Sequence, residues 1–136
     1  MKRLIAVVLV LALVLSLVAC GTGGDVSTYG RRLDESEVYS EEEIIAAMDV
    51  VEAFFKKEYD GCKLNNLEYI EELSVEAADE WAEQYLAEEA IVLISSFDVD
   101  SSGGDGSLEP NETYDNWQWI LTRNEGEDWT LQTWGY

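Results

Sequence analysis

SEEEIIAAMDVVEAFF, residues 40–55, predicts an amphipathic helix from its first residue. Ser40 and Glu43 form a capping box, in which the serine hydroxyl accepts a backbone N–H and the glutamate reaches back. Apolar residues then recur at spacings of three and four, which gives the helix one apolar face. They are Ile44, Ala47, Met48, Val51, Phe54 and Phe55. Gly61 is expected to end the helix, and the rest of the domain is expected to cover the apolar face.

A weaker strand pattern and a second helix follow. Residues 62–71 predict a strand with an irregular middle, where Asn65-Asn66 is expected to mark a bulge. Ser74 then stands before a second apolar stripe and is expected to cap a helix over residues 75–90.

The remaining elements follow the period of strands. Residues 90–99 are apolar on both faces, which is typical of a covered central strand. Residues 117–122 and 129–134 alternate on either side of a turn at 123–127, and so predict a hairpin. Gly126 is the expected residue with positive φ. Trp134 and Tyr136 are out of phase with Trp129, so they are expected on the opposite face of the sheet.

The order helix-strand-helix-strand-strand-strand predicts an α+β domain. We expect two helices packed on one face of a curved, mainly antiparallel sheet of about four strands. This order is similar to that of a reduced nuclear transport factor 2-like or cystatin-like cone, a resemblance that implies a pocket inside the cone and frequent dimers. The amino-acid sequence of residues 91–136 also resembles that of uncharacterised small lipoproteins of Gram-positive bacteria, for which no activity is established.

The first twenty residues predict export and a lipid anchor. Lys2 and Arg3 precede an apolar run, which is the pattern of a secretory signal. Leu17-Val18-Ala19-Cys20, followed by Gly21, resembles the lipobox of bacterial lipoproteins. The resemblance implies cleavage before Cys20 and diacylglycerol on its thiol, with palmitate-type chains in the bilayer. A membrane helix or signal peptide that ends in a core cysteine is the alternative.

The lipobox divides the chain into three parts. Residues 1–19 are expected to be a lipoprotein signal peptide, residues 20–39 a flexible acylated tether, and residues 40–136 the globular domain. The expected location is the extracytoplasmic face of the cell membrane, where the bilayer is the partner that Cys20 engages.

Charge narrows the choice of partners. The chain has eight basic and 29 acidic residues, and loss of Lys2 and Arg3 with the signal peptide leaves a net charge of −23. Nucleic-acid binding is excluded, because it needs clustered Lys and Arg. The charge keeps the domain soluble, and it can also attract cations or a basic partner.

The second cysteine, Cys62, is assessed for disulfide formation and for reactivity of its thiol. With Cys20 acylated, Cys62 has no partner within the chain, so a disulfide framework is excluded. Cys62 is expected to be a buried, inert thiol, since a reactive thiol needs a cationic or histidine neighbour. The sequence holds no histidine.

Residues 98–109 have the spacing of an EF-hand calcium loop, with Gly103 at the position of the sharp turn. The candidate ligands are Asp98, Asp100, Ser102, Asp105 and Glu109. Three features oppose this interpretation: Asp105 stands where that family has an apolar residue, a strand leads in, and Pro110 follows at once. A solvated hairpin connection is the alternative.

No nucleophile–base pair, phosphate loop or zinc spacing is present, so we expect a protein that is not an enzyme and has no cofactor. An enzyme that uses two carboxylates is the catalytic alternative. A binding domain is favoured, because aromatic residues can line an open cone for a small apolar ligand or a peptide, or form a face for a protein partner or a homodimer. These residues are Trp81, Tyr85, Phe97, Trp117, Trp119, Trp129 and Trp134; each can instead fill the core.

Overall fold

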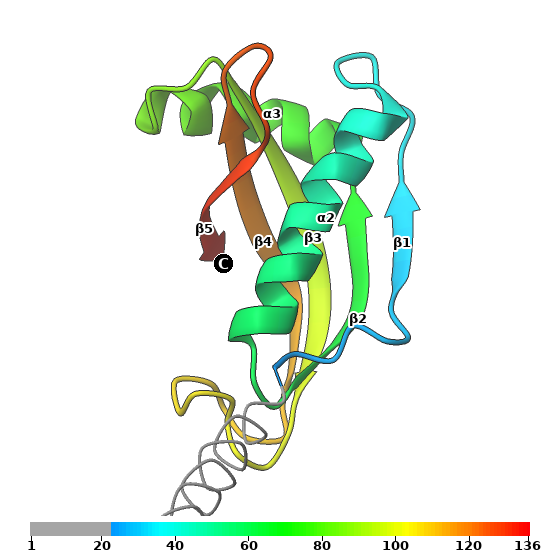
Figure 1. Cartoon of the computed structure of the whole chain (residues 1–136), viewed down its shortest axis with the longest axis vertical. Helices are drawn as coiled ribbons and strands as arrows, with labels where there is room; N and C mark the ends of the chain where they lie inside the picture. Colours follow the sequence, from blue (N-terminus) through cyan, green and yellow to red (C-terminus); the bar gives the residue numbers. More distant parts are fainter. Residues whose placement is uncertain (1–22) are drawn as a thin grey trace, which may run out of the picture.

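The computed structural model describes residues 23–136, which form two helices and one five-stranded sheet (Figure 1). In chain order the elements are β1 (Gly30–Leu33), α2 (Glu41–Glu58), β2 (Cys62–Tyr69), α3 (Glu71–Gln84), β3 (Glu89–Val99), β4 (Thr113–Arg123) and β5 (Thr130–Gly135). The strands lie in sequence order, and β1–β2 is the parallel pair. The predicted α+β class is confirmed, with five strands rather than four. The predicted signal peptide and Cys20 lie outside the described residues.

Helix α2 forms as its sequence predicts. Its capping box is present, with the Ser40 hydroxyl accepting the Glu43 N–H at 3.2 Å and the Glu43 carboxylate accepting the Ser40 N–H at 3.2 Å. The apolar face is buried along the helix. The helix ends at Glu58, and Gly61, with φ +74°, turns the chain into β2.

The two helices cover opposite faces of the sheet, so the predicted packing on a single face is wrong. Ile91 and Leu93 of β3 belong to the core cluster that holds the apolar face of α2, whereas Val92 is buried outside that cluster. Successive residues of a strand point to opposite faces. Helix α3 crosses behind the sheet at the end where β3 begins, and α2 lies in front (Figure 1).

Helix α3 starts earlier and ends earlier than predicted. It begins at Glu71, and Ser74 is 1% exposed inside its first turn. Because β2 stops at Tyr69, the N–H of Val92 in β3 has no strand partner there, and the Ser74 hydroxyl accepts it at 3.0 Å. The predicted capping residue therefore pairs with a backbone N–H of β3 that β2 does not reach. The helix ends at Gln84, two residues before Leu86, whose φ is 53°.

The predicted strands at residues 90–99 and in the hairpin are confirmed, and the strand predicted over residues 62–71 forms but ends at Tyr69, because α3 begins at Glu71. The pairing of β2 with β3 shifts between Leu64 and Asn66, where the paired asparagines predict a bulge. Gly126 in the hairpin turn has φ +79°, also as predicted.

The predicted flexible tether is wrong over its described part, residues 23–39. Asp25 forms a bridge with Lys63, and β1 pairs along β2. Arg31 of β1 forms ion pairs with Asp49 and Glu52 of α2, at 2.9 and 3.5 Å. The segment is polar because it forms a sheet edge beside solvent, so its composition is like that of a linker.

Within residues 23–136, neither helix has the length and apolar character that crossing a bilayer requires.

Candidate functional site

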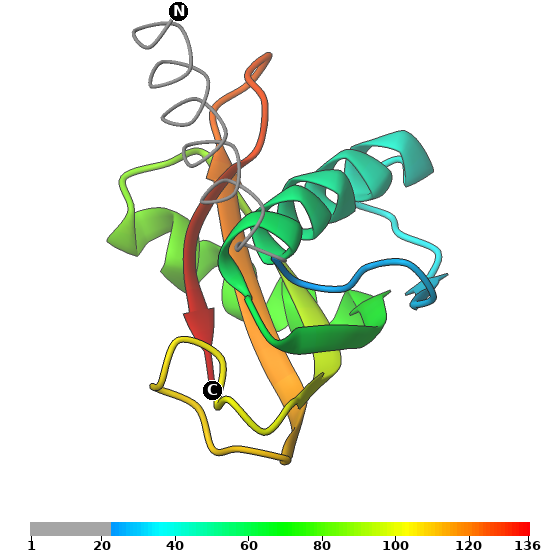
Figure 2. The same ribbon diagram turned by 60° about the horizontal axis from the view of Figure 1, so that its bottom comes forward.

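A groove of about 600 Å³ opens between the C-terminal end of α2, the loop after β3, and strands β4 and β5. Figure 2 brings this end of the molecule forward. Ten residues line the groove: Phe54, Glu58, Tyr59, Asp60, Gly104, Asp105, Ser107, Leu108, Trp117 and Trp134. Four of them are aromatic and three carry carboxylates, so the groove brings several groups of both kinds together in a concave surface.

Aromatic rings form the walls of the groove. The Phe54 and Trp134 rings lie 4.6 Å apart between centroids, and Trp134 is 42% exposed. Trp117 packs against Tyr136, at 5.2 Å, and Tyr136 is 79% exposed. Large exposed aromatic side chains side by side are characteristic of binding surfaces, because leaving them in water costs free energy that a ligand recovers.

Two polar atoms belong to these aromatic walls. The Trp117 indole N–H is buried and has no hydrogen-bond partner among the described residues. Burial raises the pKa of the Tyr59 hydroxyl above its usual range, so this phenol is neutral at physiological pH. A buried donor without an acceptor costs free energy, and this kind of group is often found where a ligand or water completes the site.

Carboxylates surround the aromatic walls. Glu58 and Asp60 are exposed at the end of α2, and Asp105 is exposed in the loop opposite. The Ser107 hydroxyl and N–H donate to Asp105, at 2.5 and 2.9 Å, and hold the pKa of its carboxyl below the usual range. The rim is therefore negative at neutral pH, above walls whose ring faces also attract positive charge.

The aromatic residues proposed from the sequence do not form one site. Trp117 and Trp134 line the groove, and Phe97 is buried behind Trp117 with a centroid distance of 5.3 Å. Trp119 and Trp129 fill the core, as the alternative interpretation proposed. Trp81 of α3 and Tyr85, the residue after the end of this helix, stack on each other away from the groove.

The sequence analysis did not predict that Phe54 and Tyr59 line the groove or that Tyr136 packs against Trp117. It also placed Trp134 on the wrong face of the sheet. Trp134 pairs with Trp119 and contacts Phe54 on the α2 side. The pairing of β4 with β5 shifts between Ile120 and Leu121, which inserts one extra residue into β5 and reverses the alternation beyond it. A bulge of this kind has no marker in the alternating pattern of β5.

Four of the five predicted calcium ligands form local hydrogen bonds through their side chains, and the fifth, Glu109, forms one through its backbone. Asp98 accepts the Thr113 hydroxyl at 2.6 Å across the β3–β4 pair, and Asp100 accepts the Ser102 N–H at 2.8 Å. Asp105 belongs to the turn described above, and the Glu109 N–H donates to the Tyr114 hydroxyl at 3.0 Å. No group of three or more Asp, Glu, His or Cys side chains in residues 23–136 is placed to hold a metal ion. Calcium binding by this loop stays a prediction.

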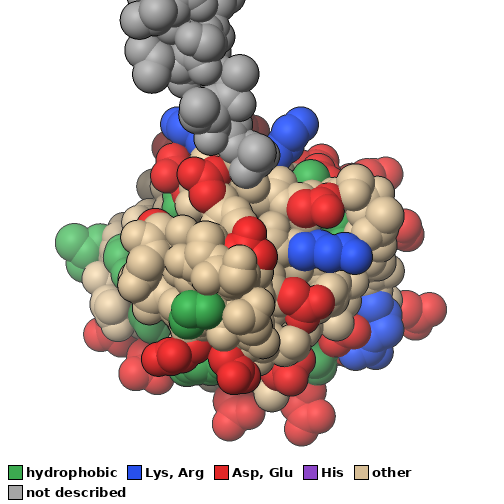
Figure 3. Space-filling model, turned by 90° about the horizontal axis from the view of Figure 1, so that it is seen from below, with side chains coloured by type: hydrophobic (Ala, Val, Ile, Leu, Met, Phe, Trp, Pro, Cys, Tyr) green, Lys and Arg blue, Asp and Glu red, His purple; other side chains and the backbone are tan. Residues whose placement is uncertain are grey.

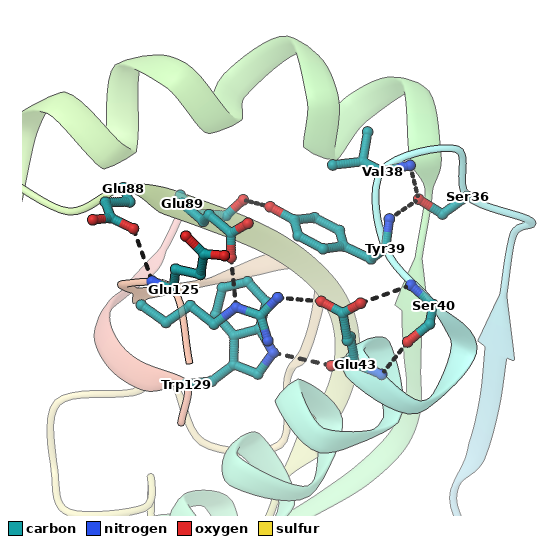
Figure 4. Close-up of polar contacts among 11 residues, drawn as sticks. Ser36, Val38, Tyr39, Ser40, Glu43, Glu88, Glu89, Glu125 and Trp129 are labelled. Atoms are coloured by element: carbon teal, nitrogen blue, oxygen red, sulfur yellow. Dashed lines mark hydrogen bonds and ion pairs between the residues drawn. The ribbon is translucent and has the colours of Figure 1, made fainter. Parts of the chain in front are cut away.

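A second polar cluster surrounds Arg123 at the opposite end of α2 (Figure 4). Its guanidinium pairs with Glu43 and, at 2.6 Å, with Glu89, and lies 4.1 Å from the centre of the Trp129 ring. The Trp129 indole N–H donates to the Glu43 carbonyl at 3.0 Å. Because the guanidinium is paired with carboxylates of α2 and β3, this cluster joins α2 to β3 and β4.

Cys62 is buried, as predicted, with 3% of its surface exposed. Burial, reinforced by the charges of Asp100, Asp105 and Asp60, raises the pKa of its thiol to about 11. The thiolate is the nucleophilic form, so the folded environment suppresses its reactivity.

Alkylation of Cys62 is therefore expected to be slow in the folded domain. At pH 8, a thiol with this pKa has on the order of a hundredfold less thiolate than a free cysteine. We expect iodoacetamide to label a Cys20→Ser variant at pH 8 far more slowly in buffer than in guanidinium chloride, measured by mass spectrometry. Equal rates in the two conditions would contradict a buried, protonated thiol.

No protein-family model, curated protein or solved structure matches this chain. Its function must therefore be inferred from its own residues. The groove and the lipobox-like segment are the two features that indicate a function rather than a role in folding.

Proposed function

We propose that the chain is an extracytoplasmic lipoprotein, anchored through Cys20, whose domain binds a small organic cation in the groove between α2 and β5. The proposed role is binding rather than catalysis. The lipobox-like Leu17-Val18-Ala19-Cys20 supports the anchor, and the groove supports the binding. The resemblance to a cystatin-like cone is not needed, because the groove lies beside α2 rather than inside a closed sheet.

The observation that carries the proposal is the combination of aromatic walls and a carboxylate rim. A cation over an aromatic face gains about 0.5–2 kcal/mol, more when water is excluded. Phe54, Trp117 and Trp134 supply such faces, and Glu58, Asp60 and Asp105 supply opposite charge around them. An anion would be repelled by the rim and by the net charge of the mature chain.

A cation with an apolar surface fits this groove better than a metal ion does. Quaternary ammonium groups have no N–H and are weakly hydrated, so the aromatic walls can replace the water that they lose. A small metal ion needs several oxygen ligands at short distance. The carboxylates of the groove stand on different segments around aromatic side chains, which suits a bulky cation.

Choline and its uncharged isostere, 3,3-dimethylbutan-1-ol, test the proposal. We expect choline to change tryptophan emission in a saturable way, because Trp117 and Trp134 line the groove. The isostere should bind more weakly, and added salt should weaken choline binding because the rim is exposed. Equal binding of both compounds would show that charge plays no part in binding. If neither compound binds, the proposed ligand class is wrong.

Two variants locate the site. One unit charge at roughly 4 Å contributes about 1 kcal/mol in water, so Glu58→Gln is expected to weaken choline binding about fivefold. Glu80→Gln changes an exposed carboxylate on α3, away from the groove, and should leave binding unchanged. Equal effects of the two substitutions would indicate a general effect of charge instead of a site.

A further inference from the structure

The described chain begins against the C-terminal end of α2. The Gly24 N–H donates to the Lys56 carbonyl at 3.0 Å, which satisfies one of the carbonyls that the helix leaves unpaired. The next residue continues this attachment, since the Asp25 N–H donates to the Cys62 carbonyl at 2.8 Å and the Asp25 carbonyl accepts the Leu64 N–H at 2.9 Å. The chain is therefore fixed to the domain from Gly24 onward.

The approach to the helix is close enough to require glycine. A Cβ added to Gly23, whose φ is +64°, would lie 2.0 Å from the Lys56 carbonyl oxygen. A Cβ added to Gly24 would lie 2.4 Å from the Phe55 carbonyl oxygen. Backbone atoms cannot move away as a flexible side chain can, so these two glycines hold the chain at this point of the surface.

This attachment shortens the distance between the lipid and the domain. Cys20 is four residues before Gly24, and four extended residues span at most about 14 Å. A flexible tether from Cys20 to Tyr39 would instead span up to roughly 65 Å. We propose that the domain lies directly on the bilayer, with the C-terminal end of α2 toward the lipid headgroups. This inference rests on the proposed acylation of Cys20.

Basic and acidic side chains are mixed at this end of the molecule. The depression beside Gly23 and Gly24 is lined by two lysines, Lys56 and Lys63, against three aspartates, which are Asp25, Asp98 and Asp100. The groove at the same end adds three further carboxylates, which belong to Glu58, Asp60 and Asp105. Figure 3 views this end and shows basic side chains beside the point where the described residues begin. Electrostatic attraction to anionic lipids therefore does not select this end, and the proposed orientation rests on the short attachment.

The same end carries the groove. Phe54, Glu58 and Tyr59 belong to the last turns and the cap of α2, within a few residues of Lys56. In the proposed orientation the groove opens near the bilayer surface, while the hairpin turn at Gly126 points away from it. Helix α2 has 18 residues, so the two ends are about 27 Å apart.

Quenching of site-specific fluorophores in the full acylated protein tests the orientation. Cys62→Ser removes the internal thiol, and a cysteine-reactive dye is placed either at Lys57→Cys, at the proposed membrane end, or at Glu125→Cys, in the exposed hairpin turn. With the protein in vesicles of phosphatidylglycerol and phosphatidylethanolamine, a headgroup spin label is expected to quench the dye at 57 severalfold more than the dye at 125. A ten-residue Gly-Ser insertion after Thr22 should abolish most of this difference.

Two measurements separate failure of the anchor from failure of the orientation. Radioactive fatty acid should label the wild type and leave a Cys20→Ser variant unlabelled; an unlabelled wild type would overturn the anchor itself. If the wild type is labelled but the dyes at 57 and 125 are quenched equally, the short attachment does not orient the domain. Quenching that is unchanged by the insertion would overturn the same inference.

Discussion

Replacement of Trp119 by alanine is expected to cost about 3–5 kcal/mol of unfolding free energy, because it removes a fully buried indole from the centre of the core. Trp119 is 0% exposed. Its ring lies 5.4 Å from that of Tyr59 and 6.4 Å from that of Trp134, between ring centroids. The substitution therefore leaves a cavity behind the groove wall.

The lost indole also breaks a buried hydrogen bond. The Trp119 N–H donates to the Ser95 hydroxyl at 2.8 Å, and Ser95 keeps its other partner, the Trp117 carbonyl, at 3.4 Å. Loss of such a bond adds about 0.5–1.5 kcal/mol to the cost. The effect should thus fall at the upper part of the expected range.

Urea unfolding followed by far-ultraviolet circular dichroism measures this loss. Trp81→Ala makes the same change at a half-buried position on α3, whose aromatic neighbour is Tyr85, and should cost clearly less. If the two variants are equally stable, Trp119 does not hold the core together as its burial indicates.

Replacement of Arg123 by methionine is expected to destabilise the fold by about 2 kcal/mol. Two carboxylates, Glu43 and Glu89, would lose their shared partner and face each other uncompensated. The contact of the guanidinium with the Trp129 ring would also be lost, which is worth about 0.5–2 kcal/mol. The expected cost lies between that of an exposed ion pair and that of a buried one, because the Arg123 side chain is 17% exposed.

This destabilisation should depend on pH. The hydrogen bond from Arg123 lowers the pKa of the Glu43 carboxyl. A lowered pKa in the folded state stabilises the fold above the ordinary pKa of glutamate, and this contribution is lost as the pH falls through the lowered value. The stability difference between wild type and Arg123→Met should therefore be largest at neutral pH and shrink in acid.

Arg32→Met is the matched control for this variant. Arg32 also faces two carboxylates, Asp34 and Glu68, each at 3.4 Å, but its side chain is 58% exposed. Exposed ion pairs contribute little, so this substitution should leave the urea midpoint nearly unchanged. A loss as large as that of Arg123→Met would show that the cluster around Trp129 has no special role.

The order of the elements from α2 onward followed from the sequence, whereas β1 was not predicted. Residues 40–55 determine α2, since its cap and apolar period depend on neighbours three or four positions away. The hairpin turn with Gly126 and the covered strand β3 were also predictable, because alternation and turn residues are local signals. The burial of Cys62 followed from its lack of a partner and of an activating neighbour.

The part of the candidate site that was predictable is its composition. The sequence identified Trp117 and Trp134 as candidate aromatic residues, but it did not predict which side chains surround them. Phe54 read as a core residue of α2, although it contacts Trp134 at the groove. Contacts of this kind join residues that are about eighty positions apart, and no local pattern encodes them.

Local sequence signals thus determined which segments become helices and strands, because caps, periods and turns act over a few residues. Only the tertiary structure decided where those segments pack. The bulge in the β4–β5 pair turned Trp134 into the groove. The open edge of β2 paired with residues 30–33, and the part of β3 that extends beyond β2 took Ser74 away from a helix cap. Each of these outcomes depends on how strands that are distant in the sequence pair, and on which backbone groups that pairing leaves without a partner.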